Sequence, residues 1–353
     1  MKKNIAVVGA GFFGISAALI LSKKHNVTIF DKSDEILSGA SKKNQLRFHK
    51  GYHYPRSIKT LSEIKEFSGL FLNFFGKDIL GSTINYYGVA KKNSKTTYKK
   101  FLNFLNTNKL TYSKYSGKYF NLKIISGTII SKESNLNFFK IKKRIKNYLK
   151  STSIKLKLNT KFRKSFVIKY DKIIIACYDQ NNTVLNDLGL KPKNEYRYEL
   201  IEKIIIKLPS KFYKKSFMVI DGKFVSLDPY LGTKYHLLSD VENSKIEIIK
   251  KGYFPKFKDN RAKYLGSGIV NNIKISNFKI FIKKCSQYLP FLESAEYIGS
   301  YFVTRALNTN KEKTDERLNS ILRYNKKIYS IHSGKWNTCI GLAKKISSTI
   351  DND

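Results

Sequence analysis

The first 31 residues contain the feature that most limits what this chain can fold into. The segment "NIAVVGAGFFGISAALILSKKHNVTIFD" opens with a short apolar run at 5–8, typical of a strand buried in a parallel sheet. A glycine-containing turn follows, then a helix-like apolar stretch at 14–24 and a second apolar run at 27–30. This order predicts a strand, a tight turn, a helix and a second parallel strand, the unit from which α/β sheets are wound.

Three glycines in the turn point to a ligand. Gly9, Gly11 and Gly14 have the spacing G-x-G-x-x-G. Gly9 permits the sharp turn, Gly11 has no side chain to block a pyrophosphate, and Gly14 lets the helix pack close to the strand. The helix start directs free N–H groups and the positive end of its dipole towards the phosphates. The motif therefore predicts a dinucleotide site.

An acid at the end of the second predicted strand supports this interpretation. Asp31 lies 22 positions after Gly9, where a carboxylate accepts hydrogen bonds from a ribose and disfavours a 2′-phosphate. NADP is therefore not expected, and a glycine turn without a ligand would leave the acid unexplained. The residues predicted to contact the nucleotide are Gly9, Gly11, Phe12, Phe13, Gly14, Asp31 and Lys32.

The net charge of +41 suggests a nucleic-acid or anionic-membrane partner at first sight. The excess is mainly lysine spread along the whole chain, and Lys, Asn, Ile, Tyr and Phe are enriched together, as an AT-rich genome would give. This even spread of lysines favours a solvated surface over a nucleic-acid site. Three cysteines without a CxxC pair predict neither a zinc site nor disulfides, and they fit a reducing cytoplasm.

The N-terminal "MKK" and the uncharged run at 4–22 could also indicate a signal peptide or a short membrane span. The glycine spacing and the strand-like segment behind the run favour a buried strand and helix instead. We therefore expect no membrane span.

Later segments favour FAD over NAD. A polar loop, "SGASKKNQLRFHKGYHYPRS" at 38–57, stands where a simple NAD domain would continue with a helix and a third parallel strand. Residues 169–182 read as a buried strand that ends at Ala176 and enters a polar loop. Near the C-terminus, a strand at 328–331, a Ser-Gly turn and a helix form a second strand–turn–helix unit, which would direct N–H groups at another part of the ligand.

Together these pieces resemble the FAD-dependent oxidoreductases related to D-amino acid oxidase, glycine oxidase and L-2-hydroxyglutarate dehydrogenase. The matching segments are "VVGAGFFGISAALIL", the loop at 38–57, "YYGVAKK", "DKIIIACY", "DGKFVSLDP" and "SGKWNT". The resemblance implies an α/β fold, with a Rossmann-like FAD-binding domain and an inserted substrate domain that contains a mixed or antiparallel sheet.

Patterning along the chain gives the expected domain limits. Short apolar stretches between turn signals at 194–260 predict antiparallel strands, whereas 62–110, 133–149 and 274–288 have helical character. The FAD-binding domain is expected to consist of residues 1–60, 121–190 and 310–353, and the substrate domain of residues 61–120 and 191–309.

The resemblance also implies that the loop at 38–57 follows the cofactor. The residues expected near the FAD phosphates or ribityl chain are Ser41, Asn44, Gln45 and Arg47, and those near the flavin ring are His49, Gly51 and Tyr54. Other expected cofactor contacts are Ala176, Ser333, Gly334, Lys335 and Trp336. One of the two loop histidines, His49 and His53, is expected only to hydrogen-bond backbone, and a covalent histidyl–flavin bond is a minority alternative. No metal site is expected.

Catalytic candidates follow from what flavin chemistry asks of a protein. Arg56 and Arg305 are the expected clamps for a substrate carboxylate, because a guanidinium fork fixes its position and angle. An alcohol substrate needs a base, for which His49 or His53 is the candidate, whereas a neutral amine needs none. Tyr54 and Tyr235 are candidates for orienting the substrate, and His236 is expected to be structural.

The function predicted from these features is FAD-dependent oxidation of a CH–NH or CH–OH bond in a small polar substrate, one that can carry a carboxylate. Two alternatives stay open: a flavoprotein that modifies RNA with its lysine-rich surface, and a nucleotide-binding module without catalysis. The electron acceptor is not evident from the sequence.

Overall fold

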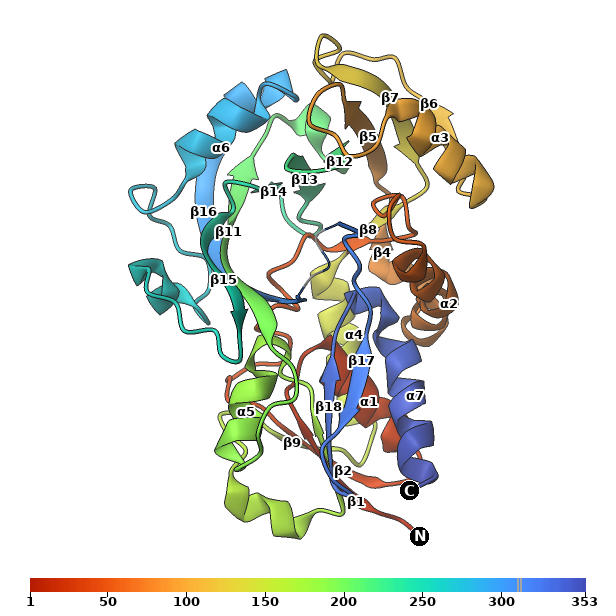
Figure 1. The fold of residues 1–353 in the computed structure, drawn as a ribbon, viewed down its shortest axis with the longest axis vertical. Coiled ribbons are helices and arrows are strands. Elements are labelled where there is room, and N and C mark those ends of the chain that lie inside the picture. Colours follow the sequence, from red (N-terminus) through yellow and green to blue (C-terminus); the bar gives the residue numbers. More distant parts are fainter. Residues whose placement is uncertain (310, 312) are drawn as a thin grey trace.

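The computed structural model describes residues 1–309, 311 and 313–353, and it arranges them around a parallel sheet and a larger mixed sheet (Figure 1). The strands of the first sheet, in spatial order, are β17 (Ser320–Arg323), β18 (Ile328–His332), β10 (Lys172–Ile175), β1 (Asn4–Val8), β2 (Asn26–Phe30) and β9 (Lys155–Lys157). All neighbours are parallel except β17, which runs antiparallel to β18.

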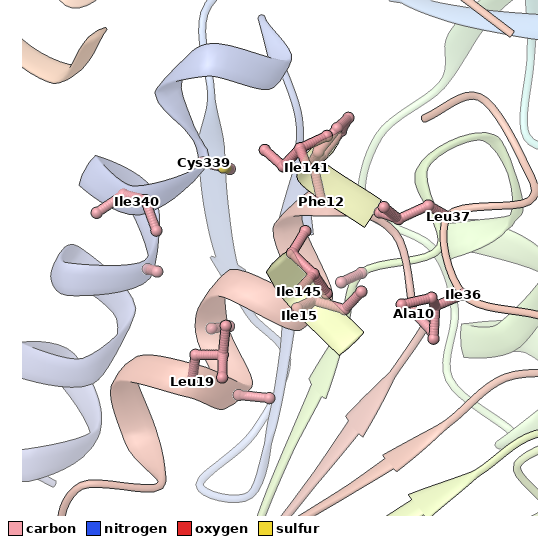
Figure 2. Close-up of a cluster of buried hydrophobic side chains, with 14 of the residues drawn as sticks. Ala10, Phe12, Ile15, Leu19, Ile36, Leu37, Ile141, Ile145, Cys339 and Ile340 are labelled. Atoms are coloured by element: carbon pink, nitrogen blue, oxygen red, sulfur yellow. The ribbon is translucent and has the colours of Figure 1, made fainter. Parts of the chain in front are cut away.

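Helices cover both faces of this sheet. On one face, α1 (Phe12–Leu21), α4 (Phe138–Lys150) and α7 (Cys339–Asp351) share a core, and Figure 2 shows their side chains meeting. On the other face lies α5 (Asn181–Asp187). Successive residues of β1 alternate between the two cores, because side chains of a strand point to opposite faces. This explains why its buried residues, 5–8, are all apolar.

The second sheet forms the upper half of the molecule in Figure 1. Its path runs through β15 (Lys245–Gly252), β11 (Tyr196–Lys207), β14 (Tyr235–Asp240), β13 (Val225–Pro229), β12 (Lys215–Ile220), β5 (Ile84–Ala90), β7 (Ile125–Ser131) and β6 (Tyr112–Lys114), with β16 (Glu296–Asn308) on the other edge of β11. The helices α3 (Tyr98–Thr107) and α6 (Phe278–Cys285) pack on it.

A small sheet connects the two halves. It consists of β3 (Arg47–Phe48), β8 (Ser134–Leu136) and β4 (Leu80–Gly81). The long helix α2 (Ile58–Phe75) follows β3 and packs against α7. Through β3, the polar loop predicted to follow the cofactor is therefore held between the halves.

The predicted fold class is confirmed. The parallel β1–α1–β2 unit forms as expected, and the strands between 194 and 260 pair antiparallel with one another. The prediction of a helical region at 62–110 was wrong in its middle. Residues 84–90 form β5, whose apolar and aromatic run is buried between β12 and β7, and β5 pairs with β12 in parallel.

The expected domain limits assign two elements to one domain, whereas in the structure these elements pack with the sheet of the other. β7 lies within 121–190, the expected FAD-binding part, yet it belongs to the second sheet. α2 lies mostly within 61–120, the expected substrate part, yet it packs against α7, which covers the first sheet. Among the described residues, none of the helices combines the length and the apolar character needed to cross a membrane.

Candidate functional site

The glycine turn after β1 is shaped by close backbone contacts. Gly9 has a φ of +110°, and a Cβ at this position would lie 2.6 Å from the carbonyl oxygen of Ala176. A Cβ on Gly14 would lie only 1.9 Å from the carbonyl oxygen of Gly9. Both positions therefore require glycine, which is what the motif predicts for the turn and for close helix packing.

The start of α1 is suited to an anion. Its first turn contains no acidic residue, and its N-cap, Gly11, has no capping side chain. The Phe12 N–H is 3.1 Å from the Ser41 hydroxyl, which accepts its hydrogen bond. The Phe12 side chain is buried, so this residue can offer a ligand only its backbone. Phe13 is partly buried against the core, and Lys32 is exposed.

Asp31 lies at the end of β2, directly beside this turn. One carboxylate oxygen accepts the Ala10 N–H at 2.6 Å, and the other accepts the Ser33 N–H at 2.8 Å. Each carboxylate oxygen can accept a further hydrogen bond. The acid is thus fixed in orientation by backbone and still has lone pairs for the hydroxyls of a ribose.

The loop after Ser41 is stabilised by its own polar side chains. Asn44 accepts the Leu46 N–H at 2.6 Å through Oδ1 and donates through Nδ2 to the carbonyls of Ala40 and Ser41. These bonds support Leu46 in the left-handed region, with φ of 54°. The side chain of Asn44 is therefore engaged in shaping the loop.

Two residues that the sequence placed near the cofactor reach the second sheet instead. Gln45 donates to the Ser226 hydroxyl on β13 at 2.8 Å. Arg47 is fully buried and donates to Asp228 at 2.7 Å and to the Ser216 hydroxyl at 2.6 Å. Their polar ends thus bind protein groups of the other half, a long-range pairing that residue spacing alone does not reveal.

A second carboxylate joins this buried network. Glu133, 2% exposed, lies 3.5 Å from the Arg47 guanidinium and accepts the Tyr87 hydroxyl at 2.5 Å and the Lys50 N–H at 2.8 Å. Its Oε1 is also 3.8 Å from His49 Nδ1. Glu133 and Asp228 are not among the residues predicted from the sequence, because a single acid without a neighbouring motif gives no local signal.

The aromatic and histidine residues of the loop gather with one residue from the C-terminal segment. The ring centroid of Tyr54 is 5.5 Å from that of His49 and 5.2 Å from that of His53. The Lys335 ammonium is 4.7 Å from the Tyr54 ring centroid. Nδ1 of both histidines and the Tyr54 hydroxyl are buried without a hydrogen-bond partner among the described residues. Such atoms are expected where a ligand completes the site.

Burial shifts the titration of this cluster. Desolvation lowers the pKa of His53 to about 4 and, helped by the positive charge of Lys335, holds the pKa of His49 well below its usual value. Desolvation, with the charge of Arg317 nearby, also lowers the pKa of Lys335 to about 7. Both imidazoles are therefore neutral at pH 7, and the Lys335 ammonium titrates near that pH.

The C-terminal segment closes the site from the side of the first sheet. Ser333 and Gly334 follow β18, and a Cβ on Gly334 would lie 2.1 Å from the carbonyl oxygen of Arg317. Trp336 packs against the rings of Phe12 and Phe48. Asn337, another residue missed by sequence analysis, donates to the His49 carbonyl at 2.9 Å and leaves its own Oδ1 unpartnered.

Both arginines predicted to clamp a carboxylate already bind one from the protein. Arg56 donates through Nε to Asp221 at 2.5 Å and through Nη2 to the same carboxylate at 3.1 Å. Arg305 on β16 binds Glu199 on β11, with Nε 2.7 Å from Oε2. The side of each guanidinium that suits a bidentate contact is thus occupied.

The two residues of the second sheet that the sequence considered differ in role. His236 is buried and pairs its Nε2 with the Phe212 carbonyl at 3.1 Å, as a structural histidine does. Tyr235 packs against the core of the first half.

Comparison with known proteins gives a family match for the N-terminal part and a fold match for the whole chain. Residues 4–83 match the model of the FAD dependent oxidoreductase family. An FAD-dependent monooxygenase, FPY4, from Fusarium mangiferae is 22% identical over 99% of this chain and 92% of its own length. The FAD-dependent monooxygenase kojA from Aspergillus flavus is 40% identical over 64 residues, which are 18% of this chain and 15% of that protein.

Solved structures share the fold over nearly the full length. L-α-glycerophosphate oxidase from Mycoplasma pneumoniae, solved with FAD bound, has a TM-score of 0.74 at 13% identity and covers 99% of this chain and 95% of its own. Glycine oxidase from Geobacillus kaustophilus has a TM-score of 0.71 at 12% identity, with 100% and 96% covered. L-proline dehydrogenase from P. horikoshii has a TM-score of 0.71 at 11% identity, with 99% and 94% covered.

Proposed function

We propose that the chain is an FAD-dependent oxidoreductase of the D-amino acid oxidase-like superfamily and that it oxidises a CH–NH or CH–OH bond of a small polar substrate by hydride transfer to the flavin, a proposal supported by the family match of residues 4–83 and by the shared fold. The observation that carries the proposal is the cluster of His49, His53, Tyr54 and Lys335, in which the buried Nδ1 atoms of both histidines and the Tyr54 hydroxyl have no hydrogen-bond partner among the described residues. The cluster combines residues from the loop at 38–57 with one from the C-terminal segment, an arrangement expected of a site that encloses a bound ligand.

The residues at both ends of the site fit FAD. The turn at Gly9 and the start of α1, whose first turn contains no acidic residue, suit a pyrophosphate, and Asp31 keeps lone pairs for a ribose. The unpartnered Tyr54 hydroxyl and Asn337 Oδ1 suit the polar edge of a flavin ring. When bound, the flavin supplies the two-electron acceptor, and the protein supplies position, charge and exclusion of water.

The side chains of the loop then have distinct proposed tasks. Ser41 accompanies the phosphates, while Asn44, Gln45 and Arg47 hold the loop in shape and place. His49 and His53 are neutral at pH 7 and can accept a proton from a substrate hydroxyl through a ring nitrogen. With a neutral amine no such transfer is needed, so these residues would only orient the substrate.

The experiment that tests the proposal is anaerobic mixing of the FAD-loaded protein with amino acids, amines, hydroxy acids and sugar derivatives. Loss of the visible flavin absorbance with one class identifies the bond that is oxidised. His53→Gln should slow this bleaching for an alcohol by roughly 100-fold or more, the usual contribution of a positioned base, and leave an amine nearly unaffected. Bound FAD that no class of compound bleaches would indicate a nucleotide-binding module without catalysis.

A further inference from the structure

Near the proposed reaction site, Lys203 and Lys335 form no ion pair with a carboxylate among the described residues. The neighbouring arginines are each neutralised: Arg56 by Asp221, Arg305 by Glu199, and Arg317 by Asp315. Lys203, on β11, is 5% exposed, and its ammonium donates a hydrogen bond to a neutral amide. Lys335 has the Tyr54 ring as its neighbour. An ammonium held in the interior without a paired carboxylate is suited to bind an anion from outside the chain.

Lys203 is held in a fixed place by Gln45. Its Nζ donates to Gln45 Oε1 at 2.9 Å. The amide cannot turn away, because Gln45 Nε2 donates to the Ser226 hydroxyl at 2.8 Å and to the Ser226 carbonyl at 3.2 Å. An ammonium has three donors, and one bond to an amide oxygen leaves two that can bind a ligand.

The register of the second sheet shows which way Lys203 points. On β11 it is directly opposite Tyr301 of β16, and two residues along, Ile205 packs into the core of the first half. Side chains two apart on a strand share a face. Lys203 therefore points to the loop and the first sheet, the side on which the flavin is proposed to lie, and not to the outer surface.

We propose that Lys203, oriented by Gln45, binds an anionic oxygen group of the substrate, a carboxylate or a phosphate, in the role that the sequence assigns to Arg56 and Arg305. This inference rests on the proposed function and names the residue that selects among its substrates. The competing explanation is that the Lys203–Gln45 bond only fastens the two halves together.

The titration of Lys203 gives the proposal a distinctive pH dependence. Desolvation lowers its pKa to about 7, with Asp228 opposing the shift and the charges of Arg305 and Lys335 reinforcing it. An anion beside the ammonium favours the charged form and raises this pKa. Binding therefore takes up a proton, and the affinity for an anion should decline as pH rises from 7 to 9.

The test uses the FAD-loaded protein and simple anions, so it does not require the substrate. Acetate and inorganic phosphate are titrated separately while the visible absorbance of the bound flavin is recorded, and the anion that binds more tightly identifies the source. Lys203→Met should weaken binding roughly tenfold or more, as expected for a lost charge-assisted bond. Lys203→Arg should recover part of it, because it retains the positive charge.

The matched control is Lys234→Met, which removes an exposed lysine from the loop before β14 and should leave the anion affinity unchanged. Equal affinity in Lys203→Met, wild type and the control, or no saturable anion binding in the wild type, would overturn the proposal. Retention of FAD by each variant verifies folding. If substrates still bleach the flavin but Lys203→Met binds anions as tightly as the wild type, this inference alone is refuted. If no substrate bleaches the flavin of the wild-type protein, the proposed function is refuted.

Discussion

The nucleotide turn and the histidine-bearing site are built in different ways. The turn depends on backbone: Gly9 and Gly14 are required by contacts within one strand–turn–helix unit, and Asp31 follows on the next strand. The histidine-bearing site depends on side chains from distant segments, and buried charges hold its loop against the second sheet. A short motif can encode the first kind of site, whereas the second exists only once both halves are folded.

The largest expected effect comes from breaking the buried charges. Arg47→Met leaves Asp228 and Glu133 buried without their cation, and it should lower the free energy of unfolding by about 3–5 kcal/mol. Denaturant titration of the FAD-free protein measures this. Lys207→Ala, which removes an exposed ion pair with Glu296, is the control and should cost about 0–1 kcal/mol. Equal effects would mean that the buried network does not connect the halves.

The next largest effect is expected from a substitution in the glycine turn. Gly14→Ala forces a methyl group onto the Gly9 carbonyl, and overpacking of this kind should cost about 1–3 kcal/mol and sharply reduce FAD binding. The control is Gly69→Ala on the exposed face of α2, where a Cβ meets nothing within 4 Å. There the same change should stabilise the protein by roughly 0.5–1 kcal/mol. Thermal unfolding and FAD fluorescence quenching separate the two outcomes.

A milder change isolates the ribose contact. Asp31→Asn retains the shape but loses the charge that accepts the Ala10 N–H, and it should weaken FAD binding roughly tenfold, or about 1.4 kcal/mol. Asp34→Asn, at an exposed position three residues on, serves as the comparison. If both variants bind FAD like the wild type, the acid does not contact the nucleotide.

The smallest effect concerns the histidine-bearing site and depends on pH. Lys335 has a folded pKa of about 7, below the value of an unfolded lysine, so its burial destabilises the FAD-free protein below pH 7. The penalty disappears as pH rises from 7 towards 10.4, the unfolded pKa. Lys335→Met should therefore be more stable than wild type at pH 6, on the order of 1 kcal/mol after solvent screening, and should match it near pH 10. A difference independent of pH would contradict this.

Local patterns predicted much of this molecule. The apolar runs, the glycine spacing and Asp31 predicted β1 and β2 to about one residue and α1 to about three, because those elements are determined by neighbours in the chain. The same holds for β18 and the helix after it. β5 was missed because its apolar run follows a real helix, α2, and is assigned to a strand only by its partners β12 and β7.

The candidate site was predictable in composition but not in pairing. The sequence located the loop that carries His49, His53 and Tyr54, and the structure brings these residues together with Lys335. It could not show that Arg56 and Arg305 have carboxylate partners, since Asp221 and Glu199 lie more than 100 positions away along the chain. Nor could it identify Lys203 among so many surface lysines, because only burial distinguishes it.

The fastening of the loop has a consequence for redesign. The side chains of Gln45 and Arg47 bind Ser226 and Asp228, and the Asn337 side chain donates to the backbone carbonyl of His49, so this segment is attached on both sides. Insertions here would separate Arg47 from the buried carboxylates that it binds. Libraries aimed at new substrates should therefore leave this segment unchanged.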